Sequence, residues 1–196
     1  NEILKTISQV TTALSEGEIL EIVKTADVRT TEKDYYEIIG NKTAVLFGAA
    51  CEIGAILGNR TAEERKALRN FGYSLGIAFQ LMDDILDYTS YNDVLGKHVG
   101  TDLKEGKVTL PLIHVLKNAK PEDLNYIERL FAKQKITQRD FNRVHTMIEK
   151  NGGIAYTVEA TEKELNKAKK YLDIFPRSKY KSALFELADY MLNREM

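Results

Sequence analysis

Three aspartates stand in an otherwise apolar segment, FQLMDDILDY at residues 79–88. Taking a carboxylate out of water without a partner costs several kcal/mol, so Asp83, Asp84 and Asp87 need a proton, a basic side chain or a metal ion. On a helix of 3.6 residues per turn, Gln80 and these aspartates fall at i, i+3, i+4 and i+7 and form one polar stripe. Such a stripe is typical of a divalent-metal site, of a buried ion-pair network or of a solvent-facing helix surface.

The surroundings of the stripe favour a cavity over the two simpler alternatives. The other faces of the segment are apolar, and Gly72 and Gly76 continue the stripe backwards without side chains to fill the space beside it. Mg²⁺ prefers octahedral oxygen ligands and is typically held by one or two carboxylates together with substrate phosphates. A calcium loop of the EF-hand type is not expected, because a helix interior lacks its ligand spacing.

Isolated lysines supply charges that could answer the aspartates. Lys42, followed by Thr43, interrupts an apolar helical pattern in GNKTAVLFG, and Lys97 and Lys107 each follow a glycine in the segment 89–108. A lysine in such a setting can simply extend its ammonium group to water, and a charged loop can simply be solvated. Flexible lysines can also bind phosphate as point charges. Walker A spacing is absent, which excludes a nucleotide P-loop. Together these residues indicate a ligand with a diphosphate at one end and a hydrocarbon at the other.

The elements that carry these residues are predicted to be helices. Apolar residues recur at helical spacing, only 3 prolines and 12 glycines occur, and no sustained alternation indicates strands. We expect helices over about 2–25, 31–58, 61–88, short ones from Pro111 and Pro121, 137–150, 154–175 and 178–196. The first helix should bury Ile3, Ile7, Val10, Leu14 and Ile22. Residues 89–108 are predicted to be the one long non-helical connection.

The composition bounds the class of protein. The 196 residues carry a formal net charge of -1, which argues against a general nucleic-acid surface. They suffice for a single helical domain, 1–196. The one cysteine, Cys51, lies in an apolar run and is predicted to be a buried thiol suited to a reducing cytoplasm. Neither a transmembrane segment nor a signal peptide is expected, and the chain opens without Met in a helical pattern.

Several separated motifs resemble the trans-prenyl diphosphate synthases. FQLMDDILDY followed by LGKHVGTDLKEGKVTLPL is similar to their second aspartate-rich region, KTAVLF to their Lys-Thr helix and SEGEILE to the helix before it. NGGIAYT matches a late helix start, and EGKVTLPL is closer to the long-chain, octaprenyl type. The resemblance implies an all-α bundle of long, mostly antiparallel helices around a deep cavity. It also implies Mg²⁺-dependent head-to-tail condensation of isopentenyl diphosphate with an allylic diphosphate, in a cytoplasmic homodimer.

The resemblance also implies roles for individual residues. Asp83 would be the chief Mg²⁺ ligand, Asp84 would assist directly or through water, and Asp87 would hold water or a basic side chain. The allylic diphosphate would be bound by Lys42, Lys97 and Lys107. The seat of the reacting carbons would be lined by Thr43 and Gln80, and the isopentenyl site by Phe79.

The sequence departs from the family's pattern in one respect. These enzymes carry a first DDxxD motif with an arginine pair, and basic groups for isopentenyl diphosphate nearer the N-terminus, whereas this sequence holds a single DDxxD, at 83–87. We therefore expect a C-terminal part of a family member that does not catalyse elongation by itself. The alternatives are a non-catalytic helical subunit of a heteromeric synthase and a class I terpene cyclase. A cyclase would pair DDxxD with an Asn/Ser/Glu triad that is not found here.

Overall fold

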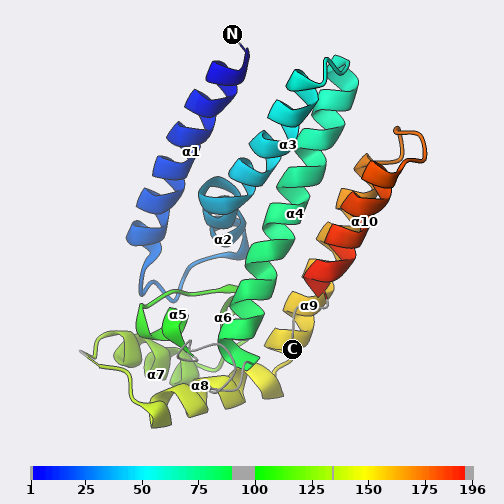
Figure 1. The fold of residues 1–196 in the computed structure, drawn as a ribbon. Coiled ribbons are helices and arrows are strands. Elements are labelled where there is room, and N and C mark those ends of the chain that lie inside the picture. Colours follow the sequence, from blue (N-terminus) through cyan, green and yellow to red (C-terminus); the bar gives the residue numbers. More distant parts are fainter. Residues whose placement is uncertain (1, 90–99, 134, 193–196) are drawn as a thin grey trace.

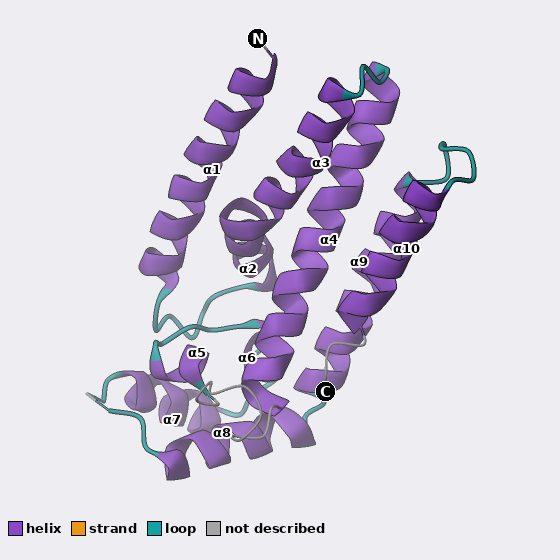
Figure 2. Ribbon diagram, viewed as in Figure 1, coloured by secondary structure: helices purple, strands orange, loops and turns teal. Residues whose placement is uncertain are grey.

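The computed structural model describes residues 2–89, 100–133 and 135–192. The predicted all-α architecture is confirmed, because these ranges contain helices and loops but no strand (Figure 2). In chain order the elements are α1 (Glu2–Lys24), α2 (Glu32–Ile39), the π-helix η1 (Gly40–Ala44), α3 (Val45–Leu57), α4 (Ala62–Thr89), α5 (Thr101–Lys104), α6 (Leu110–Leu116), α7 (Pro121–Phe131), α8 (Gln138–Lys150), α9 (Gly153–Tyr171) and α10 (Lys179–Leu192).

Most of the helices fall into two groups, a bundle and a set that packs at one end of it. Helices α1, α3, α4, α9 and α10 run side by side, whereas α5 to α8 gather at one end of this bundle (Figure 1). The 28-residue α4 packs against α3 on one side and α9 on the other. None of the described helices is both long enough and apolar enough to cross a membrane.

Local capping chemistry sets most of the helix starts. Thr31 caps α2 and Thr137 caps α8, each in a reciprocal box with the aspartate three residues later. The predicted box at Thr61 is also present, since its backbone N–H donates to Glu64 Oε2 at 2.8 Å. Prolines occupy the first turn of α6 and α7, where a missing N–H costs nothing.

Three predicted boundaries differ from the structure. The single helix expected over 31–58 is divided into α2, η1 and α3, because the chain makes a π-helical turn where α1 approaches it closely. The connection predicted to be non-helical contains α5, whose first turn is held by a carboxylate from α4. The helix expected to reach residue 175 ends at Tyr171, because the following residues form a turn anchored by the buried Leu172.

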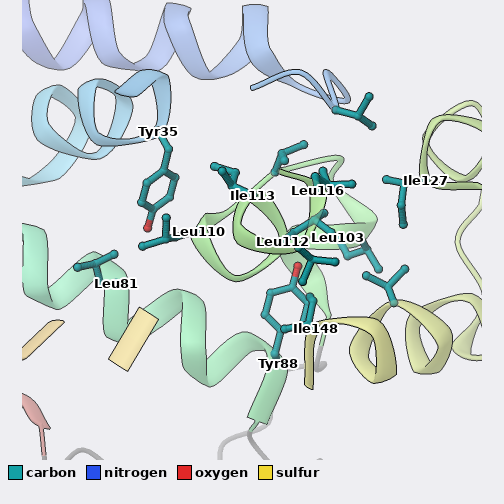
Figure 3. Packing of buried hydrophobic residues seen from close by; sticks show 14 of the residues in the cluster. Tyr35, Leu81, Tyr88, Leu103, Leu110, Leu112, Ile113, Leu116, Ile127 and Ile148 are labelled. Carbon is teal, nitrogen blue, oxygen red and sulfur yellow. The ribbon is translucent and has the colours of Figure 1, made fainter. Parts of the chain in front are cut away.

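Two apolar clusters hold the bundle together. One joins α2 and the C-terminal part of α4 to α6, α7 and α8, with Tyr35, Leu81, Tyr88 and Leu110 among its members (Figure 3). The other joins the N-terminal part of α4 to α9 and α10 through Phe71, Leu75, Leu165, Leu172 and Met191. The N-terminal part of α4 therefore packs in the second cluster, and the aspartate-rich segment packs mainly in the first.

Helix α1 confirms the predicted inward face at Val10 and contradicts it at Ile7 and Ile22. Ile7 is 47% exposed and Ile22 is 66% exposed, whereas the buried positions are Thr6, Val10 and Gly17. The small Gly17 lies against the turn that carries Lys42, so the contact line of α1 is rotated away from its apolar stripe. Much of that stripe faces outward within the described part of the chain.

Candidate active site

A cavity of about 220 Å³ opens between α1, the α2–η1 segment, the C-terminal half of α4 and the segment 102–109. Its lining brings together four carboxylates and three ammonium groups: Glu21, Asp83, Asp84, Asp102, Lys24, Lys42 and Lys107. Apolar side chains, among them Ile38, Ile39 and Val108, complete the wall. The structure thus unites Lys42, Gln80, Asp83, Asp84 and Lys107, which the sequence analysis selected from three separate segments.

The π-helical turn η1 positions Lys42 at the cavity. A Cβ at Gly17 of α1 would lie 2.6 Å from the backbone nitrogen of Lys42, so α1 can approach this turn only because position 17 is glycine. Single π-helical turns within α-helices are frequent at functional sites. The Lys42 ammonium pairs with Glu21 and lies 3.1 Å from Glu18 Oε2, both on α1. Burial lowers the pKa of Lys42, but these carboxylates outweigh burial and raise it overall.

Asp84 is the most deeply buried carboxylate of the site, at 2% exposure. Tyr35 Oη donates to its Oδ2 at 2.5 Å, and Gln80 Nε2 donates to its Oδ1 at 2.9 Å. Figure 3 shows Tyr35 extending from α2 toward α4, beside Leu81 and Leu110. Burial, and then the charges of Asp102 and Asp83, raise the pKa of Asp84 well above its usual range despite both hydrogen bonds. Asp84 therefore accepts hydrogen bonds from two neutral donors, while the charges of Asp102 and Asp83 disfavour its ionised form.

Asp83 and Asp102 are the carboxylates whose charges act on Asp84. Both line the cavity, and the charge of Asp83 acts on Asp102 as well as on Asp84. Burial raises the pKa of Asp102, although Lys107 lies 3.3 Å from its Oδ1 and opposes the shift. Lys107 also pairs with Glu105 at 2.8 Å, and its pKa is raised by Glu105 and Asp102 against the effect of burial.

Asp87 does not line the cavity with the other members of the predicted stripe. Its Oδ1 accepts the backbone N–H of Thr101 and its Oδ2 that of Asp102, each at 3.1 Å. It therefore caps the start of α5 and positions Asp102 and Lys107. Burial and the charge of Asp102 raise the pKa of Asp87 to about 6.

The remaining predicted residues lie beside the cavity or outside the described ranges. Thr43 Oγ1 donates to Gln80 Oε1 at 3.2 Å and so orients the amide that serves Asp84. Phe79 lies on another face of α4, with its ring 5.4 Å from that of Phe47. Lys97 lies outside the described residues.

Gly72 and Gly76 do not leave space beside the stripe, which corrects the prediction. A Cβ at Gly76 would lie 2.6 Å from Ala44 Cα, and one at Gly72 would meet the Phe47 carbonyl and the Cys51 thiol. Both glycines instead let α4 pack closely on η1 and α3. Cys51 is partly buried there, and burial raises the pKa of its thiol.

The donor set suits a hard divalent cation that also binds a ligand. Among the described residues, no group of three or more His, Cys, Asp or Glu side chains is arranged to hold a metal by itself. Mg²⁺ is, however, commonly held by one or two carboxylates plus substrate phosphates and water. Asp83 and Asp102 offer such carboxylates, and the mutual repulsion at Asp84 is the kind that a cation relieves.

Comparison with known proteins decides the family. Residues 1–148 match the family model described as polyprenyl synthetase. The chain belongs to this family. It is 37% identical over 194 residues to octaprenyl diphosphate synthase of Escherichia coli, covering 99% of this chain and 60% of that protein. The chain thus spans about three-fifths of the length of this relative.

Solved structures of the family share the fold. A polyprenyl synthase from Caulobacter crescentus, complexed with calcium and isoprenyl diphosphate, has a TM-score of 0.93 and 36% identity. A decaprenyl diphosphate synthase from Rhodobacter capsulatus has a TM-score of 0.92 and 31% identity. In both cases the match covers all of this chain and 60% of the other.

Three cavity residues that contact predicted site residues were missed by the sequence analysis of this polyprenyl synthetase chain. Glu21, Tyr35 and Asp102 contact Lys42, Asp84 and Lys107, respectively. Glu21 and Asp102 lie in SEGEILE and LGKHVGTDLKEGK, the motifs that carried the resemblance, so a signal for both existed. Tyr35 looked like an ordinary inward position of an amphipathic helix, and nothing local marks its hydroxyl as a partner of Asp84.

Proposed function

We propose that the whole protein is a polyprenyl diphosphate synthase, which condenses isopentenyl diphosphate head-to-tail onto an allylic diphosphate for isoprenoid or quinone side-chain biosynthesis. One observation carries the proposal: α4, η1 and the segment 102–109 bring carboxylates and lysines to one cavity with apolar walls. Such a cavity suits a ligand that is anionic at one end and hydrocarbon at the other. Family membership and the names of the relatives support the same reaction.

Mg²⁺ is the proposed cofactor, with Asp83 as its chief ligand and Asp84 as an assisting one. When bound, Mg²⁺ would neutralise the diphosphate and so lower the barrier to its departure. The calcium and isoprenyl diphosphate in the Caulobacter crescentus structure support a divalent cation. The proposed role of Asp87 is narrower than direct ligation, because both of its oxygens already accept backbone N–H groups of α5.

Lysines are proposed to bind the allylic diphosphate. Lys42 and Lys107 line the cavity with their charges held by Glu21, Glu105 and Asp102, so a diphosphate would replace carboxylates as their partner. Lys97 is proposed for the same role from the sequence resemblance. As charged donors on separate segments, these lysines would orient the diphosphate and hold it after the C–O bond breaks.

Neutral side chains are proposed to shape the reacting end. Thr43 and Gln80 form one hydrogen-bonded pair beside Asp84, and we propose that their oxygens face the allylic cation as it develops. Phe79 is proposed as support for the isopentenyl site, acting from the neighbouring face of α4. The proton lost after carbon–carbon bond formation is proposed to pass to the released diphosphate.

Further proposals concern the chain and its assembly. We propose that residues 1–196 form one helical domain that catalyses little or no elongation by itself, since the sequence supplies a single aspartate-rich motif. Homodimerisation in the cytoplasm is proposed for the whole protein. Exposed apolar side chains on α1 and α3 support a contact between subunits at these two helices. They include Ile19, Ile22, Val23, Leu46 and Leu57.

Substitution of Asp83 tests the proposed function. In the intact protein, Asp83→Ala is expected to reduce Mg²⁺-dependent condensation about 100-fold or more while the helical circular dichroism is retained. Glu63→Ala, an exposed position on the first turn of the same helix, is the matched control and should retain full activity. Radiolabelled isopentenyl diphosphate incorporated into extractable product is the measurement.

Each contrary result has a defined meaning. Unchanged condensation by the Asp83→Ala protein would contradict the assigned role and favour a non-catalytic subunit whose partner holds the active site. Residues 1–196 alone should form little product, and product formation at the rate of the intact protein would contradict the proposal that they are inactive.

A further inference from the structure

The turn between α9 and α10 forms a basic and apolar tip, which we define as residues 169–181. The chain as a whole carries a net charge of -1, but this segment, KKYLDIFPRSKYK, contains five Lys or Arg and one Asp, a local charge of +4. In Figure 1 the turn lies at the end of the bundle opposite α5 to α8, away from the aspartate segment of α4.

Large apolar side chains are exposed on the tip. Ile174 is 48% exposed and Tyr180 is 72% exposed, and Pro176 between them is also exposed. The anchor of the turn is buried, since Leu172 is 1% exposed in the cluster shared with α4. The exposure is therefore not a consequence of a loosely packed segment.

Hydrogen bonds fix the turn in this arrangement. The backbone N–H of Phe175 donates to the Leu172 carbonyl at 3.1 Å, and Ser178 Oγ caps α10 by accepting the Lys181 backbone N–H at 3.1 Å. The Lys181 ammonium donates to the Phe175 carbonyl at 2.8 Å. A rigid turn that presents Ile174 and Tyr180 loses little conformational entropy when those side chains are covered.

Three exposed cations lie in the same segment as the apolar side chains. Lys170, Arg177 and Lys179 are exposed, and none of them forms an ion pair with any residue in the described ranges. Lys169, by contrast, is paired with Asp189 of α10. The Lys179 ammonium lies 5.2 Å from the centroid of the Tyr180 ring, so one of these charges lies beside exposed aromatic surface.

We propose that this tip docks the protein on an anionic membrane surface. Tyrosine is favoured at the boundary between lipid headgroups and acyl chains, where its ring is covered and its hydroxyl stays wet. Ile174 and Pro176 would enter the headgroup region, while Lys170, Arg177 and Lys179 contact lipid phosphates. Docking at this end leaves the aspartate cavity open to solvent, and the inference stands independently of the proposed reaction.

Vesicle binding tests the charge requirement. The intact protein is expected to float with vesicles that contain phosphatidylglycerol but not with phosphatidylcholine alone, and to be released as salt screens the charges. Arg177→Glu with Lys179→Glu should weaken this binding at least about tenfold, since each cation near the surface contributes about fivefold. The control is Arg139→Glu with Lys150→Glu on α8, the same charge change at the opposite end (Figure 1). Equal loss in the control, or no binding to anionic vesicles, would overturn the proposal.

A fluorescence probe tests the apolar contact separately. Residues 1–196 contain no tryptophan, so the emission added by Ile174→Trp reports on the tip when the unsubstituted protein is subtracted. Anionic vesicles are expected to shift this emission to shorter wavelength, whereas Thr146→Trp on the exposed face of α8 should show no shift. An unshifted spectrum from position 174 in the presence of bound vesicles would assign the docking to another surface. Circular dichroism confirms folding of each variant.

Discussion

Two buried aspartates, Asp84 on α4 and Asp140 on α8, have opposite electrostatic properties. Asp84 is 2% exposed and Asp140 is 8% exposed, and each accepts a hydrogen bond from a tyrosine, Tyr35 or Tyr126. Yet the pKa of Asp84 is raised well above the usual range, whereas that of Asp140 is lowered. Burial alone therefore does not explain either carboxylate.

The difference lies in their charged neighbours. Asp140 accepts a hydrogen bond from the Lys133 ammonium at 2.7 Å, together with the hydroxyl and backbone N–H of Thr137. Within the described part of the chain, Asp84 has no cationic partner and is repelled by Asp102 and Asp83. The chain itself supplies a cation to Asp140, whereas no described side chain pairs a cation with Asp84. The contrast agrees with the proposal that Asp140 is structural and that the Asp84 region binds a ligand.

Substitution of Asp84 or Asp140 by asparagine is expected to have the largest effect on stability. Without metal at pH 8, Asp84→Asn should raise the free energy of unfolding by about 1–2 kcal/mol. The raised pKa of Asp84 means that burying this carboxyl beside Asp102 and Asp83 costs stability above the unfolded pKa, and the substitution removes that cost. Asp140→Asn should lower the free energy of unfolding, because the Lys133 ammonium and the α8 cap lose their anionic partner. Urea unfolding followed by circular dichroism measures both. A loss of equal size in the two variants would remove the distinction between the regions.

Mg²⁺ binding tests the same contrast between Asp84 and Asp140, with a smaller expected effect on stability. Mg²⁺ at ten times its dissociation constant should stabilise the protein by about 1.4 kcal/mol, since a ligand bound only to the native state shifts the unfolding equilibrium. Asp140→Asn should keep this increment and Asp83→Ala should lose it. Thermal unfolding with Mg²⁺ or with EDTA is the measurement, and an undiminished increment in Asp83→Ala would place the ion elsewhere.

A third aspartate extends the comparison to pH and has the smallest expected effect. The backbone N–H and hydroxyl of Thr31, and then Lys24, lower the pKa of Asp34 to about 2. Because the unfolded value is about 3.9, the stabilisation is present above pH 4 and is lost as the pH falls through 2. Asp34→Asn should therefore cost about 1 kcal/mol at pH 7, and the cost should fall as the pH is lowered through 2. A cost that is independent of pH would show that charge has no part in this cap.

Local chemistry explains why the helices were predictable. Helices α2, α4 and α8 begin at capping boxes, in which Thr31, Thr61 and Thr137 exchange hydrogen bonds with the acidic residue three positions later. Prolines lie in the first turn of α6 and α7. Each sequence signal therefore lies within one turn of the helix start that it predicts. The division of one predicted helix at η1 was not predictable in this way. It accompanies a contact between Gly17 and the turn that carries Lys42, 25 positions along the chain.

The candidate site was predictable in its chemistry but not in its arrangement. Residue types and helical spacing correctly united Gln80, Asp83 and Asp84 on one face of α4. The same spacing assigned Asp87 to that face, but its oxygens accept N–H groups 14 and 15 positions away on α5. Helical periodicity predicts the direction in which each side chain leaves the helix axis. It does not predict which other segment of the chain packs on that side.

The sequence by itself determined an all-α protein with an aspartate-rich helix, isolated lysines and the likeness to the prenyl synthases. These features depend on interactions within a few residues or on motifs that are read directly. Only the tertiary structure decided that Tyr35 and Gln80 donate hydrogen bonds to Asp84 and that Glu21 pairs with Lys42. It also decided that Ile174 and Tyr180 are exposed on a tip where three cations have no ion-pair partner among the described residues. The physical reason is that pairing and burial depend on packing between helices, which brings together residues far apart in the chain.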